Sequence, residues 1–533
     1  MVWDDKFTIL GFDIDNKLQN LDSNFEKTKE KIKSLIRKWK PYNLSLRGRI
    51  TIAKTKLVSQ ITYISTILTP NHATLSDIQT LINNFVMGID NTNKHWINKD
   101  LMYTHTSQGG FGMIRLENFM KAIKVSWIKR YSIEKIDDNW ADIIDSFYQL
   151  SPDTRNTIHN FGPEHLNKIL KANIPVISSL FSAYRMFRNN FPTCPSTMDN
   201  SWLNQCTFYN MNITRKQPNS NKTTFLTPTF YGIPDTYHTL TIKDLYPGGA
   251  FIANAALNQL TNSTIMDMQY KNLRKHIRTH IGQNKKYDAI AIERLPQKKF
   301  TYSTPIGLLK NIKTGSGKYR KIIERNEVVS NIYNPVKLRK KLGEHDISDN
   351  QVKKSLILLH SPYIDSTGAD HIAMLKLGKT LFNNQLFAIG LLDGKNCNTC
   401  IREYNQEETE DYKHALFHCP AVQTIIHCIT RTFFPDITNK FNIAEILIST
   451  TTDKHNLYKG VIGQDLVNLI WNYFQIYIIQ CRTAHITPVS ITAIFEIKEQ
   501  LNRILKILPK SKISTFIRSS QTLSQIIKGD RGR

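Results

Sequence analysis

The sequence predicts a mainly α-helical protein of several packed modules, one of which is a small metal-binding module. At 533 residues the chain is too long for one hydrophobic core, since a domain usually holds roughly 100–200 residues. Apolar residues recur at steps of three and four in several long segments, which is the period of a helix. Three of the seven cysteines fall within residues 397–419, and such clustering favours a metal site over a disulfide framework.

The charge balance predicts a polyanionic partner. Seventy Lys and Arg residues face 44 Asp and Glu residues, which gives a formal net charge of +26. Nucleic acid is the commonest partner for such a field, and an anionic membrane is second. The N-terminus, MVWDDKFTILGFDID, lacks the pattern of a secretory signal, and the most apolar window, LVNLIWNYFQIYIIQC, falls short of the ~20 apolar residues of a membrane span. We therefore expect no membrane partner and an intracellular location, in nucleus and cytoplasm.

Residues 25–68 predict two basic helices separated by Pro41. Their apolar positions at helical spacing are Phe25, Ile32, Leu35, Ile36, Trp39, Ile50, Ala53, Leu57, Ile61, Ile64 and Leu68. The polar faces of these helices carry eleven basic residues and only two acidic ones, Glu26 and Glu30. The basic residues are Lys27, Lys29, Lys31, Lys33, Arg37, Lys38, Lys40, Arg47, Arg49, Lys54 and Lys56. Because an ordinary solvated face mixes both signs of charge, this excess predicts contacts with a phosphate backbone.

Four motifs follow one another in this part of the chain: ILGFDID, LSLRGRITIAKTKLVSQITYISTIL, INNFVMGI and GGFGMIRLENFMKAIKVSWIKRY. In this order they resemble the segment after the palm in reverse transcriptases of LINE-type non-LTR retrotransposons. The resemblance implies that ILGF ends the last strand of the palm, and that the basic helices form a thumb that holds the template–primer duplex. The motif INNFVMGI differs from the family pattern in one respect: the family usually has a Trp after the Phe of this motif, whereas this chain has Val86 and Met87.

The carboxylates that this family needs for polymerisation are not recognisable in this sequence. Polymerisation needs palm carboxylates that hold two metal ions, and no Ala-Asp-Asp hairpin occurs here. Asp4-Asp5 lies too close to ILGF to replace it, and Asp137-Asp138 is no better. TGSGKYRK at 314–321 lacks the P-loop spacing, which would need Gly in place of Ile312 and Ser or Thr in place of Tyr319. We predict a chain that binds nucleic acid without polymerising it.

Residues 136–355 predict a mostly helical linker region with polar loops. Its segment YKNLRKHIRTHIGQNKKY places basic residues beside Tyr270 and Tyr287: Lys271, Arg274, Lys275, Arg278, Lys285 and Lys286. Basic residues flanked by aromatic ones suit single-stranded RNA or displaced DNA, and a solvated helix face with a loop is the open alternative. FYGIPDTYHTLTIKDLYPGGAF resembles a small element of these retrotransposon proteins, and we expect a structural role for it.

Residues 397–419 predict a zinc site. Cys397 and Cys400 form a Cys-x2-Cys turn, and His414 and Cys419 follow after thirteen residues. A tetrahedral Zn2+ site takes four such Cys and His ligands, and thirteen residues let the chain reverse to bring both pairs to one ion. His414 rather than its competitor His418 should pair with Cys419, because neighbouring helix residues point about 100° apart. Together with LGKTLFNNQLFAIGLLDGKNC and Pro420, the pattern resembles the zinc-binding module of LINE reverse transcriptases. We expect one structural zinc, whose loss unfolds only the local module.

The remaining residues predict amphipathic helices, LVNLIWNYFQIYIIQCR and SITAIFEIKEQLNRILKILPK, and a basic tail, KGDRGR. Pro435-Asp436 and Glu445 are too closely spaced for the restriction-like nuclease of some related elements, and no ribonuclease H carboxylate set is recognisable. The sequence thus predicts five modules. Residues 1–70 hold the end of the palm and the thumb-like helices, and residues 71–135 form a helical connector. Residues 136–355 are the linker region, 356–430 the zinc-binding module, and 431–533 the C-terminal helices with the basic tail.

The resemblance implies the C-terminal half of a reverse transcriptase, which binds template RNA and target or primer DNA during target-primed reverse transcription. The upstream polymerase part of the same element is then an expected partner. Two alternatives stay open: a zinc-containing protein-interaction module, and the product of a truncated, non-functional element copy. Salt-dependent RNA binding discriminates the nucleic-acid-binding protein from the interaction module.

Overall fold

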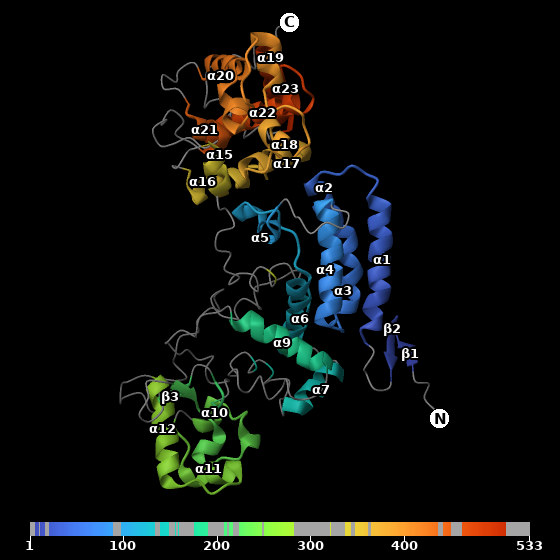
Figure 1. The fold of residues 1–533 in the computed structure, drawn as a ribbon. Helices are drawn as coiled ribbons and strands as arrows, with labels where there is room; N and C mark the ends of the chain where they lie inside the picture. Colours follow the sequence, from blue (N-terminus) through green and yellow to red (C-terminus); the bar gives the residue numbers. More distant parts are fainter. Residues whose placement is uncertain are drawn as a thin grey trace. The chain divides into compact units, whose positions relative to one another are not determined.

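Helices dominate the computed structural model, and strands occur in two short hairpins among the described residues (Figure 1). The mainly α fold predicted from the sequence is confirmed. The chain divides into two compact units, residues 1–31, 59–79 and 115–328, and residues 32–58, 80–114 and 329–533. The structure describes residues 6–9, 11–15, 21–88, 97–133, 139–148, 155, 158, 175–189, 207–210, 213–216, 223–247, 250–281, 320, 336–342, 347–360, 364–434, 441–448 and 461–507.

The first unit begins with an antiparallel hairpin in which Ile9 faces Phe12 across a two-residue turn. Gly11 takes φ +82° in this turn, a conformation that glycine adopts without steric cost. The elements of this unit are β1 (Lys6–Ile9), β2 (Phe12–Asp15), the start of α1 (Ser23–Trp39), α3 (Ser59–Ser65), the start of α4 (His72–Met87), α6 (Leu116–Ile133), α7 (Asn139–Tyr148), α9 (Pro175–Asn189), β3 (Thr214–Lys216), β4 (Thr223–Phe225), η5 (Pro228–Tyr231), η6 (Asp235–Tyr237), α10 (Ile242–Leu245), α11 (Asn254–Thr261) and α12 (Asp267–Ile281).

Buried polar side chains form hydrogen bonds between the long helices and neighbouring segments of the first unit. α6 packs along α9, and the Lys124 ammonium donates to Ser179 Oγ at 2.8 Å and to Thr69 Oγ1. Burial lowers the pKa of Lys124 to about 8. The Tyr131 hydroxyl donates to Asp145 Oδ1 at 2.7 Å, while Arg155 Nη2 lies 2.6 Å from Asp145 Oδ2. Each buried charge here therefore has a hydrogen-bonding partner, as the interior requires.

Residues from 207 to 281, here called the 207–281 module, share a hydrophobic core that runs from Phe208 to Ile277. β3 pairs antiparallel with β4 in this module, where the sequence predicted helices and loops. Gly232 ends η5 at φ +74°, and a Cβ there would lie 2.7 Å from Gln269 Oε1 of α12. The left-handed backbone conformation favours glycine at this position, and a larger residue would also displace the end of the Gln269 side chain.

The second unit contains the predicted metal-binding residues and the C-terminal helices. Its elements are the end of α1, α2 (Leu46–Ile52), the π-helical turn η1 (Ala53–Leu57), the end of α4, α5 (Lys99–Tyr103), η2 (Thr106–Gln108), α15 (Val336–Leu342), α16 (Asp349–Leu358), α17 (Ser366–Lys376), α18 (Asn383–Ala388), α19 (Asn398–Tyr404), the π-helical turn η9 (His414–His418), α20 (Pro420–Phe433), α21 (Ile443–Ile448), α22 (Val461–Thr483) and α23 (Ser490–Ile507).

The predicted basic helices are present with one change. α1 ends at Trp39, two residues before Pro41, as predicted. The second predicted helix is divided into α2, η1 and α3 by a π turn. Its predicted core positions are buried: Ile50, Ala53, Leu57, Ile61, Ile64 and Leu68.

α17 packs on α22 in the second unit. A Cβ at Gly368 would lie 2.6 Å from Ile476 Cδ1 and 2.7 Å from Asp365 Oδ2, so a larger residue there would make these side chains shift. At the end of α17, Lys376 is only 1% exposed, and its Nζ donates to Asn472 Oδ1 of α22 at 2.9 Å. Burial lowers the pKa of Lys376 to about 7, because the charged form loses its hydration there.

Several residues weighed in the sequence lie outside the described part of the chain: Asp4, Asp5, Asp137, Asp138, Lys285, Lys286, Tyr287, Pro435, Asp436, residues 314–319 and the basic tail. The predicted module boundaries stay predictions. None of the described helices has the length and apolar character needed to cross a membrane. The apolar window of the sequence forms α22, which buries Asn468, Asn472 and Gln475.

Replacing Lys376 with methionine should flatten the pH dependence of stability. The unfolded chain keeps the ordinary lysine pKa of 10.5, whereas the folded value is about 7. Between these values the unfolded state binds more protons, so the wild-type free energy of unfolding should rise with pH, by at most ~1.4 kcal/mol per unit. Urea unfolding at about pH 7 and about pH 9 should show this rise in wild type and in the exposed control Lys506→Met. An undiminished rise in Lys376→Met would contradict the assignment.

Candidate metal centre and candidate nucleic-acid contacts

The Cys-x2-Cys turn is formed by the start of α19 and by a short backbone pairing. Asn396 and Thr409 form a β-bridge, and the Cys397 amide donates to the Glu408 carbonyl at 2.7 Å. Asn405 ends α19 in the left-handed conformation, φ 51°. These contacts place Cys397 at the N-cap of α19 and Cys400 in its first turn.

The other two candidate ligands belong to a π turn, where the sequence predicted an α-helix. The Cys419 amide donates to the His414 carbonyl at 2.9 Å, an i to i+5 bond that brings residues five apart onto one side. Asp411 Oδ1 accepts from the His414 amide at 2.7 Å, and Pro420 then starts α20. The π turn therefore presents His414 and Cys419 together.

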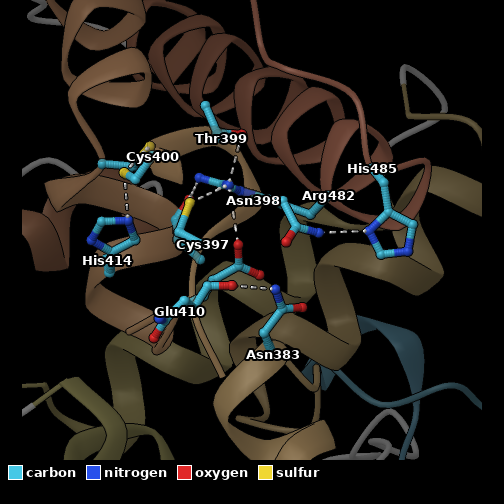
Figure 2. Close-up of polar contacts among 12 residues, drawn as sticks. Asn383, Cys397, Asn398, Thr399, Cys400, Glu410, His414, Arg482 and His485 are labelled. Carbon is cyan, nitrogen blue, oxygen red and sulfur yellow. Dashed lines mark hydrogen bonds and ion pairs between the residues drawn. The ribbon is translucent and has the colours of Figure 1, made fainter. Parts of the chain in front are cut away.

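Cys397, Cys400, His414 and Cys419 are all buried, and their ligand atoms lie within 4.8 Å of one another. Figure 2 shows Cys397, Cys400 and His414 of this cluster. Cys400 Sγ lies 3.2 Å from His414 Nε2 and 3.7 Å from Cys419 Sγ. A Zn–S bond of about 2.3 Å in a tetrahedron implies sulfur atoms about 3.8 Å apart. The donor set and its spacing are therefore compatible with zinc. His418 is exposed and is not one of the four clustered residues.

Arg482 of α22 contacts this cluster from 85 residues further along the chain. Its Nη1 lies 3.0 Å from Cys397 Sγ, 3.2 Å from Thr399 Oγ1 and 3.1 Å from Glu410 Oε2 (Figure 2). The side chains of Arg482 and Glu410 are 8% and 5% exposed. The cluster is therefore bonded to a C-terminal helix and is not confined to its own loop.

The electrostatics of the cluster follow from burial and from Arg482. Burial raises the pKa of Glu410 to about 7, although Arg482 acts to lower it. Hydrogen bonds from Cys419 and His414 and the charge of Arg482 lower the pKa of Cys397, whereas burial raises the pKa of Cys400. Cys397 is therefore the thiol most inclined to be a thiolate, the form that binds metal.

The lysines and arginines predicted on α1 lie mainly at the surface. Lys27, Lys31, Arg37 and Lys38 are exposed; Lys29 and Lys33 are half-buried. Some of these cations already have carboxylate partners, since Lys27 Nζ lies 2.5 Å from Asp13 Oδ2 and Lys29 Nζ lies 2.9 Å from Asp77 Oδ2. The Lys27–Asp13 pair is exposed on the lysine side, and an exposed ion pair is worth at most ~1 kcal/mol, so a phosphate group can compete with Asp13 for Lys27.

Arg47 and Arg49 have structural partners that the sequence did not indicate. Arg47 Nη2 donates to the Leu359 carbonyl, and Arg49 donates to the carbonyls of Val86 at 2.7 Å and Leu44 at 2.9 Å. Burial lowers the pKa of both arginines. Much of their hydrogen-bonding capacity therefore stabilises the second unit instead of facing a phosphate backbone.

The remaining predicted contacts lie on η1 and α12. Lys56 is exposed, whereas Lys54 is half-buried and its Nζ lies close to Gly112. On α12, Lys271 is exposed, and Arg274 and Arg278 are half-buried. Their binding of nucleic acid stays a prediction.

Sequence reasoning did not identify Arg482 or Glu410. Glu410 lies in the acidic stretch NQEETED, where nothing separates it from Glu407 and Glu408, which are exposed. Arg482 follows a long apolar helix, and its distance along the chain gives no signal of contact with the cysteines.

No protein-family model matches the sequence. Over 150 residues, which are 28% of this chain, the sequence is 25% identical to the transposon TX1 uncharacterized 149 kDa protein of Xenopus laevis. The matched stretch spans 11% of the length of that protein. This similarity supports a transposon-related origin for the chain.

Proposed function

We propose that the chain is a nucleic-acid-binding part of a LINE-type retrotransposon reverse transcriptase. In this role it holds template RNA and target or primer DNA through basic helices, and a structural zinc ion stabilises its metal-binding module. The observation that carries the proposal is the convergence of Cys397, Cys400, His414 and Cys419, because the spacing of these residues resembles the zinc-binding module of that family. The similarity to a transposon protein supports the same origin.

Zinc suits the cluster because three buried thiols and one imidazole converge on one point. With four protein ligands a zinc ion has no open position for water, which is the arrangement of structural rather than catalytic sites. The ion would supply cross-linking between α19 and η9. The proposal therefore assigns no reaction to this centre.

Nucleic acid is the proposed partner because exposed cations are concentrated on α1 and η1. Lys27, Lys31, Arg37, Lys38 and Lys56 are exposed in a chain with a net charge of +26. Neutralising phosphates with such groups releases counterions, which makes binding strong at low salt. The proposal assigns binding to these residues and assigns no polymerisation to them.

A second candidate function, docking of another protein on the metal-binding module, is favoured by one observation. Phe387, Ile389 and Leu391, just before the cysteines, are 46%, 58% and 67% exposed. Contiguous exposed apolar side chains often mark interaction sites. In that case the affinity of the chain for RNA should be weak and insensitive to salt.

Metal analysis of the purified protein tests the zinc assignment. Wild type purified under reducing conditions should contain about one zinc per chain, and Cys400→Ser or His414→Ala should lose it, because three ligands rarely retain structural zinc against a chelator. The matched controls Cys428→Ser and His418→Ala should keep it, since neither residue belongs to the cluster. Wild type without metal, or loss of metal in His418→Ala but not in His414→Ala, would contradict the assignment.

Charge reversal tests the nucleic-acid proposal. Changing Arg37, Lys38 and Lys56 to Glu should reduce the slope of log affinity against log salt for a template–primer duplex, by about 0.9 for each lost phosphate contact. A control with the same change in net charge reverses exposed residues of other helices and loops: Lys395, Arg431 and Lys506. The control should keep the wild-type slope. An equal effect of both triple variants, or none of either, would show that the basic helices are not the binding surface.

A further inference from the structure

The 207–281 module exposes an aromatic ring with an arginine stacked on it. Phe230 in η5 is 43% exposed, and Arg215 Cζ of β3 lies 3.7 Å from the centre of its ring. The next residue, Tyr231, is fully buried, and its hydroxyl lies 2.9 Å from His276 Nδ1 of α12. η5 thus anchors Tyr231 against α12 and leaves Phe230 at the surface.

This pair differs from the aromatic contact that the sequence suggested. Tyr270 is half-buried, and its hydroxyl donates to the Ile252 carbonyl at 2.8 Å. Its ring lies 5.7 Å from that of Phe251. Tyr270 therefore packs against the core of the module, whereas Phe230 is exposed.

The net charge of the module is positive. Its described residues include seven lysines and arginines against three aspartates. Each aspartate carboxylate accepts a hydrogen bond within the module: Asp235 from the Tyr209 hydroxyl at 2.6 Å, Asp244 from the Thr241 amide at 2.8 Å at the start of α10, and Asp267 from Asn254 at 2.9 Å. The three carboxylates offset three of the seven cations, which leaves these residues with a formal net charge of +4.

Four of these cations follow one stripe of α12. Lys271, Arg274, Lys275 and Arg278 recur at steps of three and four, which places them along one side of a helix. The core side of α12 is formed by Leu273 and Ile277, which are fully buried. η5 packs against α12, so the Phe230–Arg215 pair and this stripe lie in the same module.

We infer that the 207–281 module is a binding site for single-stranded nucleic acid, in which an unpaired base stacks on the Phe230–Arg215 pair and phosphates contact the α12 stripe. Aromatic rings and guanidinium planes both stack on unpaired bases, whereas the bases of a duplex keep their faces covered. The stacking pair therefore gives the module a preference for single strands that basic residues alone would not give. The inference rests on the proposed nucleic-acid function and adds its substrate class.

The test measures the affinity of the full chain by fluorescence anisotropy. The probes are an oligo-uridine and an oligo-thymidine of about 20 nucleotides, longer than the site of a single module, and a duplex of equal length. Phe230→Ala should weaken single-strand binding by about 5- to 150-fold, the loss expected for one stacked base. It should leave duplex binding and the salt slope unchanged, because no phosphate contact is lost. The two single-stranded probes show whether RNA or DNA is preferred.

Matched variants separate stacking from charge and from folding. Met268→Ala removes another side chain of the same module, 70% exposed, and should bind like wild type. Arg215→Lys keeps the charge but loses the planar group, so it should reproduce part of the Phe230→Ala loss, and Phe230→Trp should keep binding. Wild-type single-strand affinity in both Phe230→Ala and Arg215→Lys, or equal losses for single strand and duplex, would overturn the inference and leave the proposed function standing. Wild type without salt-dependent binding to any probe would overturn both.

Discussion

The buried guanidinium of Arg482 is the contact on which the structure around the candidate metal centre depends. It bonds to Cys397 Sγ and Glu410 Oε2, while its own helix, α22, packs on α17. A charge with 8% side-chain exposure needs such partners, since breaking a buried ion pair typically costs about 3–5 kcal/mol. The cysteine–histidine cluster and the C-terminal helices therefore stabilise each other.

Local spacing explains how much of the candidate site the sequence could predict. Cys397, Cys400, His414 and Cys419 lie within 23 residues, so turn and helix geometry alone bring them together. The π turn at His414 could not be predicted, because a helical pattern does not reveal where one turn widens. Arg482 and Glu410 could not be predicted either, since their pairing depends on how α22 packs against the metal-binding loop.

Sequence periodicity likewise predicted local helix positions but not the contacts that basic residues make with distant parts of the chain. Helical periodicity predicted α1 and the core positions of α2, η1 and α3 because each depends on residues three or four apart. It could not distinguish an arginine that faces solvent from one that holds a distant carbonyl, as Arg47 holds that of Leu359. Nor could it find the pair of Phe230 with Arg215, which requires β3 and η5 to meet. A basic residue is thus visible in a sequence, but its partner usually is not.

Hydrogen exchange of metal-loaded protein, before and after chelation, tests most directly whether the metal centre and the C-terminal helices are coupled. Spacing alone suggested that loss of metal would loosen only the local module. Because Arg482 bonds to Cys397, we predict faster exchange in α22 as well as in residues 397–419, with α6 of the first unit unchanged as the internal control. Faster exchange confined to residues 397–419 would contradict the account.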